Sequence, residues 1–548
     1  MTGTLRCALA LARSGRMRLL VWPLAMAALA VMTAVSIDEF YAEPASRAAY
    51  AAALEMADVM TALGGASGGL AQLGGMIANE LAIMVLPAVA IAGVMLAVAS
   101  TRAEEDAGRT ELVTARPVAH RAPLLGAFAP VTASLLLLAA LVVGAMTLVG
   151  VPLIGAEDGI AGPADGGALG YGMALAAYGL LFSGTGFVVA ELARDARSAR
   201  MTGLAVVALA YLVRVGVNGA SRGVTAGDDA VGLSWITPVG WFDAVAPFAH
   251  MRWAPLLVLA AAALGLHLLA VVLRGRRDLG AGLIAARPGP VSAPRRLGTA
   301  LGLAWRLARG SLLGWLLGVV ALAALMGSQL PAWIGALQQS EAMLELMGME
   351  ADASAVTNMT MAFSALLAAS AGIGRIGALA EEEDSERLAL TLSRPVGRVR
   401  LWSASVGAAL VGAAGILAAA GIVYAATGWG ALQGDAVKLD AFSVPDTILA
   451  TAVLLAPTLL LVALAAAWTG ATGRSPWPAW ALLGASAAIL FLGPGLDLPD
   501  VLIDTAPLSA VGTVPVDAPV HGAVALEAVL AAAAVVLGAL RFARRDVP

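Results

Sequence analysis

Residues 124–150 read LLGAFAPVTASLLLLAALVVGAMTLVG, a run without a single charged side chain. A helix needs about 20 mostly apolar residues to cross the hydrocarbon core of a bilayer, so this run predicts a membrane-spanning helix. Similar runs recur along the chain, and we expect about twelve spans. They lie near residues 19–37, 81–100, 124–150, 169–192, 201–219, 254–273, 312–330, 355–379, 401–427, 447–471, 478–494 and 521–540. The sequence therefore predicts an all-α polytopic membrane protein.

The composition excludes a soluble protein. Of the 548 residues, 60% are apolar and only 13% are charged, and the mean hydropathy is +0.86. A soluble domain is about half apolar and a quarter charged, because its surface must be polar. A soluble enzyme, a disordered scaffold and a partner for nucleic acid are therefore excluded. The single cysteine, Cys7, permits neither an intramolecular disulfide nor a cysteine-ligated metal site.

The basic residues fall mainly on one side of the expected spans. When successive loops are assigned alternately to two sides, 27 of the 33 lysines and arginines lie on the side that holds the N-terminus. Loops rich in lysine and arginine stay in the cytoplasm. We therefore expect a multi-pass protein of the plasma membrane, in contact with its lipids, with both termini cytoplasmic.

One cytoplasmic loop occurs twice in the sequence. Residues 104–118 read EEDAGRTELVTARPV and residues 382–396 read EEDSERLALTLSRPV, so that eight of fifteen positions are identical without a gap. Each copy follows the second expected span of its half. A weaker echo pairs Arg276-Arg277-Asp278 with Arg544-Arg545-Asp546, after the last span of each half.

These echoes indicate two six-helix repeats fused in parallel, since an even number of spans preserves orientation. The first half is expected at 1–280 and the second at 312–548. Between them, residues 281–311 are expected to form a cytoplasmic linker, rich in proline, and a helix that leads into the second half.

The repeated loop has a helical spacing. Acidic, basic, apolar and basic residues follow one another at steps of three or four positions, which predicts one face of a short helix that ends at proline. The matched sets are Glu105, Arg109, Leu112, Arg116 and Pro117, and Glu383, Arg387, Leu390, Arg394 and Pro395. A solvated loop helix attracted to anionic lipid would explain one copy. Two copies favour a surface that docks on a two-fold partner.

This loop resembles the coupling segment of ABC-type exporter permeases. The residues that carry the resemblance are those from Arg102 to Arg109, together with Arg116-Pro117-Val118. The double length of the chain, its external stretch at 44–50 and its motif at 233–241 are similar to actinobacterial permeases of polyketide-antibiotic (tetronasin-type) exporters. The second copy departs from the pattern at one position, where Glu386 replaces Gly108.

The resemblance implies the membrane subunit of an exporter of hydrophobic drugs or polyketide antibiotics, which would give antibiotic resistance. Two copies of a separate ABC ATPase would bind residues 102–118 and 380–396. ATP and Mg would be held by that ATPase, and no cofactor by this chain. The implied coupling residues are Glu104, Glu105, Asp106, Arg109, Leu112, Arg116, Pro117, Glu382, Glu383, Asp384, Arg387, Leu390, Arg394 and Pro395.

The chain itself has no ATP-binding motif. A P-loop requires a lysine after its glycine run, and the one lysine, Lys438, follows no such run. The four histidines have no spacing typical of metal ligands, and no pairing of a nucleophile with a base is readable. We therefore expect no catalytic residue, no metal site and no enzymatic activity of this chain alone.

Two alternative functions stay open. A proton-coupled secondary multidrug transporter would also fit two parallel six-helix halves, but it requires acidic residues within spans. The sequence places Glu80, Glu191 and Glu527 near the ends of spans, which disfavours that alternative. An exporter of lipids would share the fold of a drug exporter, and the sequence does not separate the two.

A substrate path is expected near the outer ends of the second and eighth spans. Methionine and aromatic side chains suit a pliable site for varied apolar compounds, and polar groups within a span are costly to bury. The candidates are Asn79, Glu80, Met84, Arg214, Asn358, Met359, Met361 and Phe363. Arg214 requires a carboxylate or carbonyl partner, and a structural clamp is favoured over substrate contact, with Asp243 and Glu80 as candidate acids.

Overall fold

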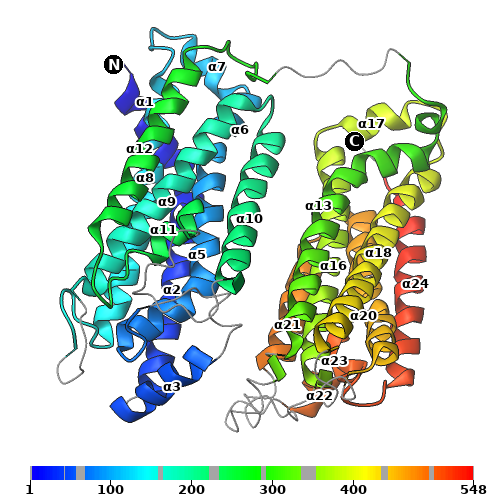
Figure 1. The fold of residues 1–548 in the computed structure, drawn as a ribbon. Helices are drawn as coiled ribbons and strands as arrows, with labels where there is room; N and C mark the ends of the chain where they lie inside the picture. The colour runs from blue at the N-terminus through cyan, green and yellow to red at the C-terminus, as the bar shows by residue number, and fades with distance from the viewer. Residues whose placement is uncertain are drawn as a thin grey trace. The chain divides into compact units, whose positions relative to one another are not determined.

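The computed structural model describes residues 3–546 except for 42, 57–67, 158–164, 221–233, 285–291, 332, 335–352, 434–441 and 493–498. These described residues form helices and turns, and none of them lies in a strand. The all-α polytopic fold that the sequence predicts is confirmed (Figure 1). The chain divides into two compact units, Met1–Pro288 and Gly289–Pro548.

Unit 1 begins with two helices that precede and form its first span. Its elements are α1 (Thr4–Ser14), α2 (Arg16–Phe40), α3 (Pro44–Met56), α5 (Leu73–Ser100), α6 (Arg102–Asp106), α7 (Arg109–Thr114), α8 (Ala122–Leu148), α9 (Gly167–Leu192), α10 (Ala196–Ala220), the 3-10 helix η2 (Ser234–Ile236), α11 (Pro238–Asp243) and α12 (Trp253–Arg274).

Unit 2 has a similar succession of long helices and short ones. Its elements are the 3-10 helix η3 (Arg295–Gly298), α13 (Ala300–Ser328), α16 (Ala353–Asp384), α17 (Arg387–Leu392), α18 (Arg398–Leu432), α20 (Val444–Thr472), α21 (Trp477–Leu492), α22 (Asp500–Thr505), α23 (Pro507–Ala510) and α24 (His521–Arg544).

Each expected span coincides with a helix, in agreement with the expected number of about twelve. Within the described residues, 11 helices are long and apolar enough to cross a membrane. The exception is α21, which has 16 residues. At 1.5 Å per residue its described part measures about 24 Å, less than the roughly 30 Å of a bilayer core. The helix expected before residue 312 is the first part of the continuous helix α13.

The long helices pack in the same order in both units. The first span contacts the third, as α2 contacts α8 and α13 contacts α18. The second contacts the fourth in the pairs α5–α9 and α16–α20, and the fourth contacts the sixth in the pairs α9–α12 and α20–α24. The two-repeat organisation stays a prediction, and this shared order of packing is an observation in its favour.

Glycines allow the central helices of each unit to approach closely. A Cβ atom on Gly93 of α5 would lie 2.8 Å from the carbonyl oxygen of Gly179 on α9. A Cβ atom on Gly372 of α16 would lie 2.4 Å from Cγ2 of Val462 on α20. Small residues serve this close packing between membrane helices, and it fixes the ends of α5 and α16, from which the repeated loops project.

Candidate functional site

The repeated loop is not one helix, as the residue spacing had predicted, but two segments joined by a left-handed residue. In unit 1 the break lies at Gly108, with φ of 71°, between α6 and α7. In unit 2 it lies at Glu386, with φ of 59°, between α16 and α17. A non-glycine residue in this region costs roughly 1–2 kcal/mol, yet Glu386 keeps the same turn. The prediction of one continuous helix was therefore wrong, because the helical spacing of the residues extends across a turn at which the backbone is not helical.

The turn separates the candidate coupling residues into an exposed set and a buried set. Leu112 on α7 and Leu390 on α17 are 74% and 72% exposed, although both are large and apolar. The residues exposed beside them are Arg109, Arg116 and Pro117 in unit 1 and Arg387, Arg394 and Pro395 in unit 2. The buried acids are Glu104 and Glu105 in unit 1 and Glu383 in unit 2. Asp106 and Asp384 are exposed, and Glu382 lies 3.7 Å from Arg375.

Glu105 is the centre of a buried network of charges. Arg277 donates to both of its oxygens, at 2.8 Å and 2.6 Å, and Arg274 donates to Oε2 at 3.2 Å. The backbone N–H of Gly280 donates to Oε1 at 2.6 Å. Arg277 also donates to Glu191, at the end of α9. Because these side chains are nearly inaccessible to solvent, each charge depends on its partners for stabilisation.

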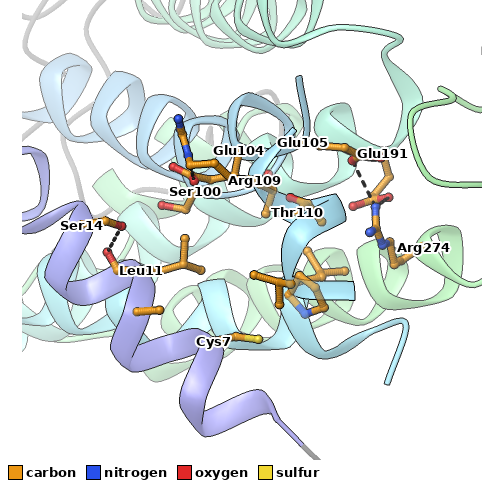
Figure 2. A pocket seen from close by; sticks show the side chains of 15 residues that line it. Cys7, Leu11, Ser14, Ser100, Glu104, Glu105, Arg109, Thr110, Glu191 and Arg274 are labelled. Atoms are coloured by element: carbon orange, nitrogen blue, oxygen red, sulfur yellow. Dashed lines mark hydrogen bonds and ion pairs between the residues drawn. The ribbon is translucent and has the colours of Figure 1, made fainter. Parts of the chain in front are cut away.

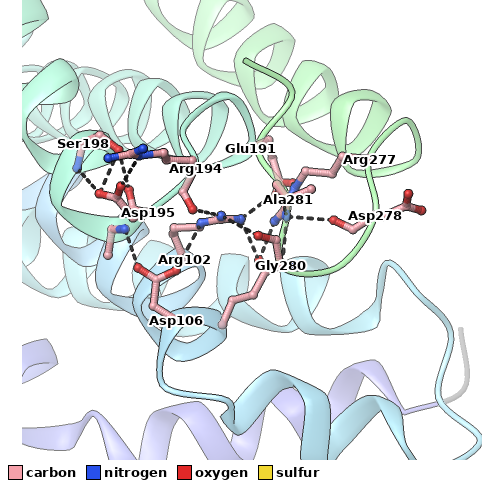
Figure 3. Close-up of polar contacts among 12 residues, drawn as sticks. Arg102, Asp106, Glu191, Arg194, Asp195, Ser198, Arg277, Asp278, Gly280 and Ala281 are labelled. Atoms are coloured by element: carbon pink, nitrogen blue, oxygen red, sulfur yellow. Dashed lines mark hydrogen bonds and ion pairs between the residues drawn. The ribbon is translucent and has the colours of Figure 1, made fainter. Parts of the chain in front are cut away.

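Arg102 and Asp106 extend this network to the turn between α9 and α10 (Figure 3). Arg102 donates to the carbonyl oxygens of Arg194 and Ala281, the second at 3.1 Å. Asp106 accepts a bond of 2.6 Å from the N–H of Ala196, at the start of α10. The short helix α6 is therefore tied to the adjacent ends of α9, α10 and α12.

Unit 2 contains a simpler version of the same arrangement. Arg545, which follows α24, donates from both terminal nitrogens to Glu383, one bond measuring 2.8 Å. The arginine also donates to the carbonyl oxygen of Gly470 on α20 at 3.3 Å. Where unit 1 has Arg102, two positions before the repeated loop, unit 2 holds Ala380. A carboxylate bound to the arginine beyond the sixth span is thus present in both units.

Glu104 joins the first span of unit 1 to α7. It accepts from Arg18, near the start of α2, at 3.1 Å, and from Arg109, the first residue of α7, at 2.5 Å. Arg109 is otherwise exposed, so this ion pair lies at the edge of the buried network. A displacement of α7 would therefore act on α2 as well as on α5.

Sequence reasoning missed Arg18, Arg102, Glu191, Arg274 and Arg277 as members of this site. The sequence contained one indication of Arg277, because Arg276-Arg277-Asp278 recurs as Arg544-Arg545-Asp546. The arginine motif and the acids Glu105 and Glu383 each occur once in each half, which indicated that the arginine and the acid of one half are partners. Arg102 lies in the loop motif itself. Its side chain donates to carbonyl oxygens that are distant in the sequence, and no local pattern of residues predicts such partners.

Two of the expected substrate-path residues are held by the helix α3. The hydroxyl of Tyr50 donates to Glu80 at 2.7 Å and accepts from the amide of Asn79 at 3.3 Å. Burial, together with the nearby charge of Glu80, raises the pKa of the Tyr50 hydroxyl above its ordinary value. Met84, one turn further along α5, is largely exposed. Tyr50 therefore occupies hydrogen-bonding groups of both Asn79 and Glu80.

Arg214 has the carboxylate partner that its burial requires. Its Nε and Nη2 donate to the two oxygens of Asp243, each at 2.9 Å, and so clamp α10 to α11. In unit 2, Asn358 donates to the carbonyl oxygen of Val514 at 3.0 Å, and Met361 is buried beside Thr451. Met359 is half-buried and Phe363 is exposed. In unit 1 the candidates thus form two separate sets of contacts, one at Tyr50 and one at Asp243.

Comparison with known proteins identifies the family of this chain. The family model for the C-terminal domain of the multidrug efflux system permease Rv1217c matches residues 297–543. The multidrug efflux system permease protein Rv1217c of Mycobacterium tuberculosis is 31% identical over 559 residues, which cover 100% of this chain and 95% of that protein. The chain belongs to this family of multidrug efflux permeases. As a member of the permease family with many apolar helices, it is a multi-pass membrane protein.

Proposed function

We propose that this efflux permease is the membrane subunit of an ATP-driven, ABC-type exporter of hydrophobic drugs or polyketide antibiotics, as in tetronasin-type exporters. Two copies of a separate ATPase dock on its cytoplasmic face, one on α7 and one on α17. The observation that carries the proposal is the matched pair of exposed leucines, Leu112 and Leu390. Each lies on a short helix that follows, after one turn, a helix end with a buried carboxylate bound to arginine.

The exposed leucines suit anchors for a partner protein. An interface draws most of its stability from a few well-buried apolar or aromatic side chains surrounded by polar contacts. Each leucine lies on a helix whose first residue is an exposed arginine, and a second exposed arginine follows the end of the helix. These two arginines would supply the polar surroundings. A leucine this exposed contributes little to the fold of its own unit, so a partner surface accounts for its presence at both positions.

The buried network behind α7 gives the docked helix a rigid connection to the membrane spans. Glu105 binds arginines from α12 and from the turn after it, and Asp106 binds the start of α10. When the ATPase closes on ATP and pushes α7, these contacts would carry the displacement to the ends of four spans. In unit 2 the connection would run from α17 through Glu383 and Arg545 to α20.

A proton-coupled transporter is the second candidate, and the structure contains one observation for it. Glu527 on α24 is buried against the unit, and its Oε2 has no hydrogen-bond partner within the described residues. It lies six positions, or about 9 Å, from the first residue of α24. The sequence had placed this glutamate near the end of a span, and the structure shows that it is nevertheless buried. A buried carboxyl group within a span is a candidate for proton coupling.

The first prediction separates the two energy sources. The purified chain alone is expected to hydrolyse no ATP, whereas its complex with the separate ATPase should hydrolyse ATP faster when a hydrophobic drug is added. In inside-out vesicles, ATP-driven drug uptake should persist after an ionophore collapses the proton gradient. Uptake that stops with the ionophore, and that continues without the ATPase, would instead establish proton coupling.

The second prediction concerns the orientation of α7 and α17. In a variant without the native thiol (Cys7→Ser), a cysteine introduced at the exposed position Ser385 should not react with an impermeant maleimide in intact cells. It should react after the cells are opened. Ala48→Cys, on the external helix α3, is the matched control and should react in intact cells. Labelling at Ser385 in intact cells would place α17 outside and contradict the docking proposal.

A further inference from the structure

A cavity of about 260 Å³ lies beside α7 in unit 1 (Figure 2). Its walls come from α1, which supplies Cys7 and Leu11, from α7, which supplies Thr110 and Val113, and from Leu124 at the start of α8. Residues at the ends of α5, α9 and α12 also line it. The cavity therefore lies between the N-terminal helix and the proposed coupling helix, away from the outer ends of the spans.

The charged groups that reach the cavity are already paired with one another. Glu104 accepts from Arg18 and Arg109, and Glu105 and Glu191 both accept from Arg277. An ionic ligand would have to break one of these pairs, and a buried charge without a partner is costly. The electrostatics of the cavity therefore disfavour both a cation and an anion as its occupant.

Two hydroxyl groups in the same cavity lack partners. Ser100 and Thr110 line it and are only 4% and 7% exposed, and neither hydroxyl makes a hydrogen bond within the described part of the chain. Neither oxygen is among the fully enclosed polar atoms that lack a partner, so both are reached from the cavity and are available to a molecule bound there. Leu11, Val113 and Leu124 provide an apolar surface beside them.

We propose that this cavity binds a small uncharged amphiphile. Its carbonyl or hydroxyl oxygens take hydrogen bonds from Ser100 and Thr110, and its hydrocarbon part lies against Leu11, Val113 and Leu124. Sites for drug-sized ligands usually measure about 300–1,000 Å³, so the occupant is a compact molecule with a short chain. Because α7 forms one wall, the occupant also fixes α7 against α1. That consequence for ATP use rests on the proposed function, whereas the binding itself does not.

Cys7 makes the occupant detectable without the ATPase. It is the single cysteine of the chain and lines the cavity. Burial raises the pKa of its thiol above the ordinary value, so its reaction with N-ethylmaleimide is slow enough to follow by mass spectrometry. The full-length chain, in phosphatidylcholine nanodiscs, would be labelled with and without 1-octanoylglycerol as the probe.

The probe is expected to slow labelling of Cys7 in a saturable manner. Octanoate and octyltrimethylammonium, which have chains of similar length but carry charge, should slow it far less. The double variant Ser100→Ala with Thr110→Val should bind the probe about tenfold more weakly, as expected for two lost hydrogen bonds. Thr114→Val is the matched control on α7, because its hydroxyl bonds to the backbone of Thr110 and does not line the cavity. It should leave protection unchanged.

A filled cavity provides the opposite test. Leu11→Trp should occupy the space and abolish protection by the probe. No protection in the wild-type chain would overturn the proposal, as would equal protection by the three amphiphiles or undiminished protection in the double variant. Since no ATPase is present, a failure of docking on α7 would leave this result intact, and the two proposals can fail separately.

Discussion

Replacement of both Leu112 and Leu390 by aspartate is expected to abolish copurification of the ATPase and drug export together. Burial of one leucine contributes about 1.5–3 kcal/mol, so each aspartate should weaken its docking site by roughly ten- to a hundredfold. The permease itself should insert and fold normally, because these side chains are 74% and 72% exposed. The measurement is the amount of ATPase recovered with a tagged permease, and each single variant should retain one docked copy.

The matched control for this prediction is Leu301→Asp. Leu301 is also a largely exposed leucine, at the start of α13, but lies outside α7 and α17. It should reach the membrane in normal amount and recover the ATPase at the wild-type level. Normal recovery of the ATPase by the Leu112→Asp, Leu390→Asp permease would remove the support for docking on these helices.

Glu105→Ala is expected to have the largest effect on stability. The substitution leaves Arg274 and Arg277 buried while removing a carboxylate that both arginines contact. Breaking a buried ion pair by removal of one partner costs about 3–5 kcal/mol. We therefore expect a clear fall in the thermal unfolding midpoint of the purified permease, measured by fluorescence-detected size-exclusion chromatography. Glu105→Gln retains an acceptor oxygen and should fall between the wild type and Glu105→Ala.

Glu383→Ala is the matched control in unit 2. It removes the corresponding carboxylate, but its partner Arg545 is 18% exposed and can be hydrated by water. The loss should be close to that of a hydrogen bond to a charged group, about 1.5–3 kcal/mol. A midpoint that falls as far in Glu383→Ala as in Glu105→Ala would contradict the argument from burial.

The unequal networks give the two docking helices different supports. In unit 1, α7 is connected through Glu104 to Arg18 on α2, and Glu105 on the preceding helix α6 binds Arg277, beyond α12. In unit 2, α17 is connected through Glu383 to Arg545. The left-handed turn is nevertheless the same in both, since Glu386 adopts the conformation of Gly108. The substitution of glycine by glutamate therefore changes neither the place of the turn nor the exposure of the leucine that follows.

The positions of the spans could be predicted from the sequence, because the thickness of the bilayer sets a length and a polarity that any run of residues either meets or fails. Among the described residues, only the span at α21 is shorter than this length. The repeated loop was also visible, and with it Leu112 and Leu390. The break within the loop was not, because a step of three or four positions continues across Gly108 in the sequence although the backbone turns there.

The partners of the buried charges were decided by the tertiary structure alone. Glu105 and Arg277 are 172 positions apart and meet only because α5 packs on α9 and α9 packs on α12. Tyr50 likewise reaches Glu80 from a separate helix. Sequence periodicity reports on which side of its own helix a residue lies, since it follows from the local backbone geometry. Which charge faces that side depends on helix packing between distant segments, and no local pattern encodes it.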